Sequence, residues 1–202
     1  MSIRVLIADD QDLVRGALAA LLGMEPDLEV VAQVGRGDEV AAAARDCGAQ
    51  VALLDIEMPG ATGIEACAAL GREVPGCVPV IVTTFGRPGY LKRALAAGAR
   101  GFVVKDTPPD RLAETVRRVH AGLRVIDPTL AEESLFAPEN PLTEREAEVC
   151  RAAEDGARLR EVAARVHLSP GTVRNHLSAV IGKTGTDTRY EAVRQARDNG
   201  WL

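Results

Sequence analysis

Short apolar runs alternate with amphipathic segments over the first part of the chain. The apolar runs are rich in β-branched residues and bounded by Gly, Pro or Asp, as buried strands are. They cover residues 3–8, 29–34, 51–55, 78–83 and 101–104. The segments between them have helical spacing and cover residues 13–23, 38–47, 63–70, 90–97 and 109–121. This alternation predicts an α/β domain whose doubly wound parallel sheet is covered by helices on both faces.

The alternation stops between residues 122 and 140, a stretch with two prolines and three glutamates. We interpret this stretch as a linker with one short helical turn near residues 129–136. Helical patterns then cover residues 144–154, 160–166, 170–184 and 189–199. The sequence therefore predicts a first domain over residues 1–121, a linker over 122–140 and a small all-α domain over 141–202.

Composition favours a cytoplasmic globular protein. Of the 202 residues, 47% are hydrophobic and 26% are charged, which excludes disordered and low-complexity classes. No apolar run is long enough to span a membrane, and the N-terminus lacks the pattern of a signal peptide. The four cysteines form no Cys-x-x-Cys pair, so neither a zinc ribbon nor a disulfide framework is indicated.

Charge is distributed unevenly along the chain. Residues 1–140 contain 14 Lys and Arg against 20 Asp and Glu, a net charge of -6, whereas residues 141–202 contain 10 against 9, a net charge of +1. The stretch 162–186 contains Arg165, Arg174 and Lys183 and no carboxylate, so we expect its cations to be unopposed. It is a candidate surface for binding a polyanion, although the whole chain carries -5.

Polar residues follow the predicted strands at the points where they end. Asp9 and Asp10 follow the first strand, Asp55 ends the third, Thr83 ends the fourth and Lys105 follows the fifth. Because the carboxyl ends of parallel strands share one edge of a sheet, we expect these side chains to converge. Three converging carboxylates would repel one another unless a hard cation such as Mg2+ lay among them.

These residue types suit phosphoryl transfer. Asp55 is placed as a carboxylate nucleophile that forms an acyl phosphate, while Lys105 and the Thr83 hydroxyl would neutralise and hydrogen-bond the phosphoryl oxygens. Taken singly, aspartates at strand ends more often cap the following helix. The combination at the ends of four different strands favours the functional interpretation.

The first part of the chain resembles the receiver domain of two-component response regulators, whose fold is flavodoxin-like (βα)5. The resemblance covers residues 1 to about 121. It rests on Asp9-Asp10, on Asp55 with Met-Pro-Gly at 58–60, on Thr83, on the segment 98–102 and on Lys105-Asp106. One departure is that residue 106 is not proline, so we assume no cis peptide there.

The receiver resemblance implies a role for each of these residues. A sensor histidine kinase would phosphorylate Asp55, and Thr83 and Phe102 would form a pair that switches conformation. Mg2+ would be held by Asp10, Asp55 and the backbone carbonyl of Glu57, with Asp9 assisting. These implications agree with the chemistry inferred from the strand ends.

The segments 160–166 and 170–184 are joined by a short turn with Ser and Pro, as in a helix-turn-helix. The second helix of that unit can enter the major groove of DNA. Arg174, Asn175 and Ser178 lie opposite its apolar positions, and Arg and Asn can hydrogen-bond guanine and adenine. A helical hairpin with a solvated basic face fits the pattern equally well until the acid-free stretch and the receiver are considered.

Nearly all of residues 141–202 resemble the LuxR-type domain of the NarL/FixJ regulators. The matching segments are 142–146, 161–163, 168–169, 172–176, 191–193 and 200–201, with Lys183 and Arg189. The resemblance implies double-stranded operator DNA as a partner, RNA polymerase as a further partner, and a second copy against the last helix. It places Arg174, Asn175 and Ser178 at bases or adjoining phosphates, and Thr172, Lys183 and Arg189 at the DNA backbone.

Two departures and one closer likeness qualify this resemblance. An often basic position is Ser178, which weakens the expected DNA affinity, and the usual Leu-Gly-Val after the recognition helix reads Thr-Gly-Thr at 184–186, which would loosen the seating of the last helix. The segments 56–60, 84–90, 140–143 and 171–175 look like the DesR subgroup, whose known member controls a membrane-lipid desaturase. This likeness suggests lipid-related or stress-related target genes.

Two predicted helices carry apolar stripes that could join two copies after phosphorylation. Family resemblance places the stripes together as a dimer face, although core packing is the alternative for about half of these residues. The first stripe comprises Leu13, Ala17, Leu18 and Leu21, and the second comprises Leu112, Val116 and Val119.

Two other classes of protein share some of these features. A haloacid-dehalogenase-type phosphatase also uses an Asp nucleophile and Mg2+, but there an acid-base Asp follows two residues later, whereas Glu57 stands at that position here. A transcription factor whose receiver domain is structural and never phosphorylated remains the alternative to a phosphorylated regulator.

Overall fold

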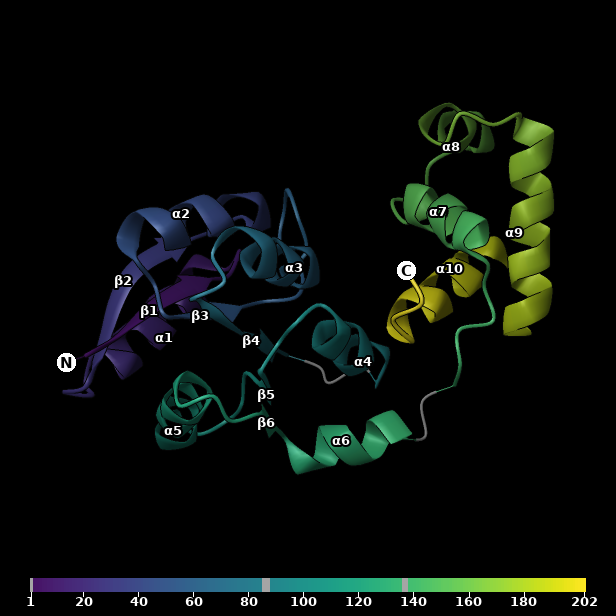
Figure 1. Cartoon of the computed structure of the whole chain (residues 1–202). Helices are drawn as coiled ribbons and strands as arrows, with labels where there is room; N and C mark the ends of the chain where they lie inside the picture. The colour runs from purple at the N-terminus through teal and green to yellow at the C-terminus, as the bar shows by residue number, and fades with distance from the viewer. Residues whose placement is uncertain (1, 85–87, 136–137) are drawn as a thin grey trace. The chain divides into compact units, whose positions relative to one another are not determined.

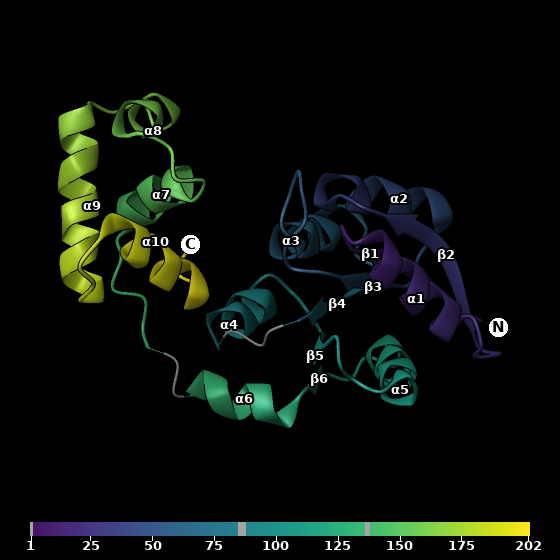
Figure 2. The ribbon, with the colours of Figure 1, turned by 180° about the vertical axis from the view of Figure 1, so that it is seen from behind.

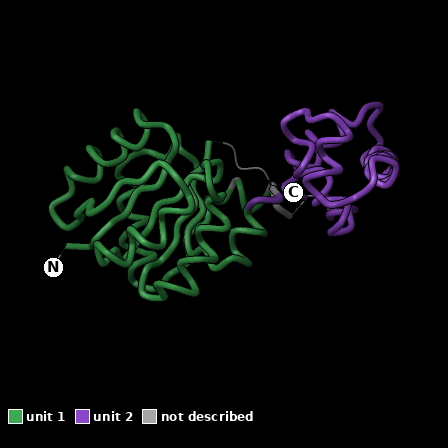
Figure 3. The backbone as a smooth tube through the Cα atoms, turned by 90° about the horizontal axis from the view of Figure 1, so that it is seen from above, with its two compact units in different colours: residues 1–86, 91–132 green, residues 87–90, 133–202 purple. Residues whose placement is uncertain are grey.

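The computed structural model describes residues 2–84, 88–135 and 138–202. The chain forms two compact units, one of residues 1–86 and 91–132 and the other of residues 87–90 and 133–202 (Figure 3). Each unit is described by itself below. No helix in the described ranges is long and apolar enough to cross a membrane.

The first unit is built on a parallel sheet with the order β2-β1-β3-β4-β5-β6. Its strands are β1 (Ile3–Ala8), β2 (Leu28–Val34), β3 (Val51–Leu54), β4 (Val78–Thr83), β5 (Gly101–Val104) and β6 (Val125–Ile126). Its helices are α1 (Asp12–Leu22), α2 (Val40–Cys47), α3 (Gly63–Glu73), α4 (Pro88–Ala96), of which residues 91–96 belong to this unit, and α5 (Pro109–His120). The short turn η1 (Gly37–Glu39) precedes α2. The predicted doubly wound α/β fold is confirmed.

Helices cover both faces of this sheet. Figures 1 and 2 show α1 and α5 on one face and α2, α3 and α4 on the other. Alternate strand residues such as Ile7, Leu53 and Val80 pack against apolar residues of α1 and α5, and their neighbours point to the opposite face. The strand order reverses beside β1, and in such folds ligands bind where the strands end at this point.

The sixth strand lies inside the predicted linker and was not predicted. Val125 and Ile126 pair with Gly101 and Phe102 of β5, and the Asp127 amide donates to the Phe102 carbonyl at 3.1 Å. Two residues are too few for a period-two pattern to be recognised. The helix α6 (Pro128–Leu135) follows and extends the predicted helical turn, whose last residue, Phe136, lies outside the described residues.

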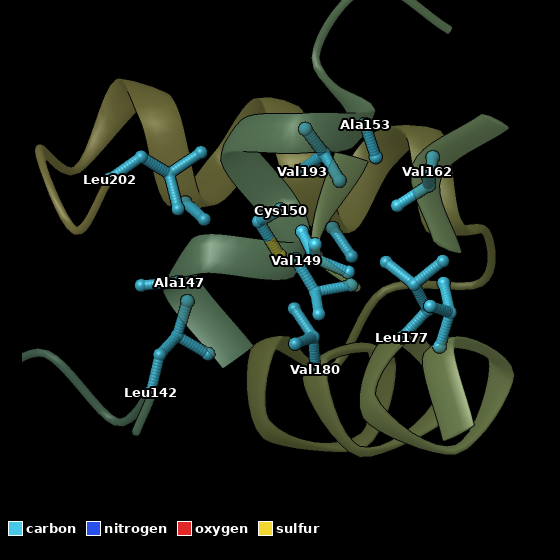
Figure 4. Close-up of a cluster of buried hydrophobic side chains, with 14 of the residues drawn as sticks. Leu142, Ala147, Val149, Cys150, Ala153, Val162, Leu177, Val180, Val193 and Leu202 are labelled. Carbon is cyan, nitrogen blue, oxygen red and sulfur yellow. The ribbon is translucent and has the colours of Figure 1, made fainter. Parts of the chain in front are cut away.

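The described part of the second unit contains α7 (Glu144–Ala153), α8 (Leu159–Arg165), α9 (Pro170–Thr184) and α10 (Arg189–Asp198). Each boundary lies within one residue of the prediction. Figure 4 shows side chains from all four helices, among them Val149, Val162, Leu177 and Val193, meeting in one buried core. Thr143 caps α7 and Thr188 caps α10 in reciprocal capping boxes, which fixes where these helices begin.

The turn between α8 and α9 contains a backbone conformation that L-residues rarely adopt. His167 has φ +53° and is not a glycine. We expect His167→Val to lower the free energy of unfolding by about 1 to 2 kcal/mol, because a β-branched residue is strained there, whereas His167→Gly should not lower it.

Trp201 is the chain's only tryptophan and is buried in the second unit, so its fluorescence in a urea titration measures this stability. The matched control is His176→Gly inside α9, which should cost about 1 kcal/mol because glycine is a poor helix former. A loss of similar size from glycine at both positions would contradict the strain at His167.

Candidate functional site

The carboxyl ends of two neighbouring strands bring the predicted acidic residues together. Asp9 and Asp10 follow β1, and Asp55 follows β3. One carboxylate oxygen from each of these three residues lies within 4.8 Å of the others. Asp9 and Asp55 are buried, whereas Asp10 is exposed. The structure therefore confirms that these carboxylates converge at one edge of the sheet.

Lys105 joins this cluster from the end of β5. Its Nζ lies 2.7 Å from Asp9 Oδ2 and 3.1 Å from Asp55 Oδ2. Burial disfavours the charged ammonium, but the ion pairs with Asp9 and Asp55 outweigh it and leave the pKa of Lys105 raised. Burial also raises the pKa of the Asp55 carboxyl, an effect that Lys105 opposes and Asp9 reinforces. Burial is the largest of these effects, so the pKa of Asp55 stays raised although Lys105 lies beside it.

The backbone around Asp55 holds its side chain in place. The Ile56 amide donates to Asp55 Oδ1 at 2.8 Å, and the Gly63 amide donates to the Ile56 carbonyl at 2.9 Å. A Cβ on Gly63 would lie only 2.0 Å from the Asp55 carbonyl oxygen, so the start of α3 can approach this peptide only with glycine there. The helix thus braces the loop that carries Asp55.

The site fits a magnesium ion. Its donors are carboxylate oxygens, which Mg2+ prefers, and few are needed because this ion keeps several water ligands. The cluster sets three carboxylates against one ammonium group, and a divalent cation would offset the negative charge that remains. Asp9, Asp10 and Asp55 are brought together here, while the predicted contribution of the Glu57 carbonyl stays a prediction.

The predicted switch residues are both buried. Thr83 is the last residue of β4. Its carbonyl oxygen accepts a hydrogen bond from the Lys105 amide at 2.7 Å, which ties Thr83 to the residue that pairs with the acidic cluster. Phe102 is fully buried in β5 and pairs with Ile81 of β4. In this conformation the aromatic ring is part of the core of the first unit.

The recognition helix of the predicted helix-turn-helix is α9. Ser169 caps it by accepting from the Thr172 amide at 3.1 Å, and Pro170 is its first residue. Val173, Leu177 and Val180 are buried, whereas the opposite face is exposed. That exposed face carries Arg174, Asn175 and Ser178, as the sequence predicts.

The expectation that the cations of residues 162–186 are unopposed is wrong for two of them. Arg165 pairs with Asp155 at 2.7 Å, and Lys183 pairs with Glu146 at 2.6 Å. Both carboxylates come from outside that stretch, so its composition could not reveal them. Arg174 makes no ion pair with any described residue, which leaves its guanidinium available to an external anion.

Glu146 is a buried residue that the sequence analysis did not single out for a functional role. It belongs to the capping box of α7 and also receives Lys183 from α9. Burial opposes its charge, but hydrogen bonds from Lys183 and Thr143 prevail and hold the pKa of this carboxyl below its usual value. The pair ties the recognition helix to α7.

The Thr-Gly-Thr sequence after α9 is held by its hydroxyl groups. Thr184 Oγ1 lies 2.9 Å from the Val180 carbonyl oxygen, to which it donates, and 3.0 Å from Thr186 Oγ1. Hydroxyl hydrogen bonds therefore take the place of apolar packing at this turn, where the sequence led us to expect a looser seating of α10.

The structure corrects half of the predicted dimer face. Leu112, Val116 and Val119 of α5 are buried against the sheet, so these residues belong to the core and offer no surface to a second copy. Their helical spacing is the same for both roles, so periodicity could not separate them. In α1, Leu18 is also buried, while Leu13, Ala17 and Leu21 are exposed.

Comparison with known proteins covers both units. Residues 5–117 match the response regulator receiver domain, and residues 140–196 match the luxR family of bacterial regulatory proteins. The chain is similar to the transcriptional regulatory protein DesR of Bacillus subtilis (strain 168), at 40% identity over 200 residues and 99% of each chain. It is also similar to the transcriptional regulatory protein UhpA of Escherichia coli (strain K12), at 37% identity over 98% of this chain and 100% of UhpA.

A solved structure aligns with the chain over its whole length. The crystal structure of response regulator ChrA, from a heme-sensing two component system, aligns with a TM-score of 0.60 and 32% identity. The alignment covers 100% of this chain and 99% of ChrA. The segment 84–90, one of those that carry the likeness to DesR, includes Phe85, Gly86 and Arg87, which lie outside the described residues.

Proposed function

The chain belongs to the transcription regulators that join a response regulator receiver domain to a LuxR-type DNA-binding domain, and we propose that a sensor histidine kinase controls it by phosphorylating Asp55. Members of this family are regulators and not enzymes. In this proposal residues 1–121 receive the phosphoryl group, residues 122–140 link the domains, and residues 141–202 bind operator DNA in the cytoplasm.

The observation that carries this proposal is the contact of Lys105 with both Asp9 and Asp55 inside the acidic cluster. An Asp55 carboxylate oxygen would attack phosphorus, so that an O–P bond forms while the N–P bond to the kinase histidine breaks. The Ile56 amide orients the carboxylate, and Lys105 and the Thr83 hydroxyl would stabilise the phosphoryl oxygens.

The role of the implied metal ion would be electrostatic. Asp10, Asp55 and the Glu57 carbonyl would hold Mg2+, with Asp9 assisting, and the ion would supply positive charge to offset that of the phosphoryl group. A chelator should therefore stop both the gain and the loss of phosphate by the intact chain. Phosphate incorporation that continues at the same rate in excess chelator would reject this part of the proposal.

Phosphorylation would favour one of two conformations of the receiver domain. Thr83 would move toward the phosphoryl group, and Phe102, two residues before the end of the neighbouring strand, would respond to that movement. The strand β5, which contains Phe102, pairs with β6. The start of the linker is therefore hydrogen-bonded to this strand. This arrangement offers a route from the acidic site to the linker.

We expect the favoured conformation to dimerise through α1. Its exposed stripe comprises Leu13 and Ala17 with Leu21, and Leu13 is 86% exposed. Leu13→Glu should abolish phosphorylation-dependent association in sedimentation measurements, because it places a charge in an apolar contact. Leu123→Glu is the control, since Leu123 is also exposed but lies after α5. Equal association of the wild type with and without phosphate would place the switch elsewhere.

For DNA we propose that Arg174 and Asn175 contact bases together with Ser178, and that the backbone is bound by Thr172, Lys183 and Arg189. A dimer would bind half-sites about one helical turn apart. Arg174→Ala should cost about 1 to 3 kcal/mol of binding and relax base preference at one position. Arg151→Ala, an exposed cation of α7, serves as control. An equal loss on specific and random DNA would make Arg174 a phosphate contact.

A finer proposal concerns the genes that are regulated. The resemblance to the DesR subgroup leads us to propose membrane-lipid or stress-related target genes, and the chain is 40% identical to DesR. DNA fragments of the source genome that the phosphorylated chain selects should then lie upstream of such genes, where RNA polymerase is a further partner. Selection of fragments upstream of unrelated genes would reject this proposal on target genes, but not the proposal that the chain is a phosphorylated DNA-binding regulator.

A further inference from the structure

Arg15 of α1 reaches back to the loop that carries the acidic site. Its Nη1 donates to the backbone carbonyl oxygen of Asp9 at 2.6 Å, and its Nη2 lies 2.5 Å from Asp12 Oδ1. The Arg15 side chain is only 19% exposed, whereas Asp12 is 90% exposed. A surface pair with Asp12 alone would contribute little. The contact with the Asp9 carbonyl is therefore the one that needs explanation.

That carbonyl belongs to the peptide bond between Asp9 and Asp10. Asp9 is fixed at its other polar atoms, because its amide donates to Val34, its Oδ1 accepts from Gln11 and its Oδ2 pairs with Lys105. Asp10, in contrast, is exposed and makes no hydrogen bond or ion pair with a described residue. Its carboxylate is positioned by the peptide that precedes it, and Arg15 holds this peptide.

The guanidinium group suits this task better than an ammonium group would. Its planar fork carries separate N–H donors, so one nitrogen can bind the Asp9 carbonyl while another binds Asp12. The group also lies against the end of β2, where a Cβ on Gly35 would be 3.4 Å from Arg15 Nη1. Contacts with β2, with the Asp9 carbonyl and with α1 leave it little freedom.

We infer that Arg15 is a positioning residue for Mg2+ binding, because it orients the peptide from which Asp10 presents its carboxylate to the cation. This inference rests on the proposed function, in which the acidic cluster binds Mg2+. It also predicts a change in Mg2+ affinity opposite to the one that charge alone would give. Arg15 is itself a cation near a cation site, so by Coulomb repulsion alone its removal would tighten Mg2+ binding. As a positioning residue, its removal must weaken Mg2+ binding.

The test is a titration of the intact chain with MgCl2, followed by amide chemical shifts in 1H–15N spectra. We expect Arg15→Met to raise the Mg2+ dissociation constant about tenfold, in the range known for groups that orient metal ligands. Arg15→Lys keeps the charge but loses the fork, and it should weaken binding in the same direction. Arg45→Met is the matched control, because Arg45 makes its exposed ion pair with Glu73, which is not part of the acidic cluster.

A second readout separates positioning from general damage to the fold. At saturating Mg2+ the Arg15 variants should take up phosphate from acetyl phosphate at the wild-type rate, because all the reacting groups remain. An unchanged or lower dissociation constant in both Arg15 variants would overturn the inference. If the wild type binds no Mg2+, or binds it equally well after Asp10→Asn, the proposed metal site itself fails.

Discussion

Asp55→Asn is expected to abolish phosphate incorporation. The change replaces one carboxylate oxygen by an amide nitrogen. It keeps the shape of the side chain but removes the nucleophilic carboxylate. The wild type incubated with acetyl phosphate and Mg2+ should gain the mass of one phosphoryl group, measured on the intact chain. The variant should gain none, because Asp55 is the carboxylate that the Ile56 amide orients, whereas the proposal assigns Asp9 and Asp10 to the metal ion.

The matched control for this loss is Asp106→Asn. Asp106 is an exposed carboxylate next to Lys105 and lies outside the acidic cluster. The Asp106→Asn variant should take up phosphate as the wild type does. Incorporation that persists in Asp55→Asn would mean that another residue accepts the phosphoryl group and would reject the assignment of Asp55.

The second large effect is expected at the ion pair between Lys183 and Glu146. Lys183→Met leaves the buried Glu146 carboxylate without its counter-ion. We expect the second unit to lose about 1 to 3 kcal/mol of stability, less than for a fully buried pair because Lys183 is 34% exposed. Urea unfolding followed by Trp201 fluorescence measures this loss. Adding Glu146→Gln should recover part of it, since the unpaired charge is then removed.

The same pair predicts a dependence on pH. The pKa of Glu146 is lower in the folded chain, so its ionised form contributes stability above the ordinary glutamate pKa of 4.5. This contribution is lost as the pH falls through the lowered value. The stability difference between the wild type and Glu146→Gln should therefore be present at pH 7 and shrink in acid. A difference that grows in acid would contradict the ion pair.

The two roles of Lys183 can be separated by salt. If Lys183 contacts a DNA phosphate, Lys183→Met should reduce the slope of log affinity against log salt by about one. If it acts only through Glu146, the affinity falls while this slope stays the same. Arg174→Ala provides the comparison, because Arg174 has no ion pair among the described residues.

Much of the fold and of the acidic site could be predicted from the sequence because both follow from regular repeats. Strands such as β1 and β4 are apolar runs with clear ends, and parallel strands necessarily bring Asp9, Asp55 and Thr83 to one edge. The start of α9 was equally clear, since Ser169 and Pro170 are strong helix-start signals.

Features that depend on contacts between distant residues could not be predicted in this way. The two-residue strand β6 has no period of its own and forms only because β5 offers an edge. The α5 residues Leu112 and Val116 have the spacing of either a core or an interface, and only packing decides. The partner of Lys183 lies 37 residues away in Glu146, beyond any local pattern.

The central claim is that phosphorylation of Asp55 controls DNA binding. The most direct measurement is the affinity of the intact chain for a DNA fragment that it selects, by fluorescence anisotropy at one salt concentration, with and without acetyl phosphate in Mg2+. The account predicts binding tighter by roughly 5-fold to 150-fold after phosphorylation, the range of a typical coupling between sites, and no such gain in Asp55→Asn. The same affinity in both states of the wild type, or an equal gain in Asp55→Asn, would contradict it.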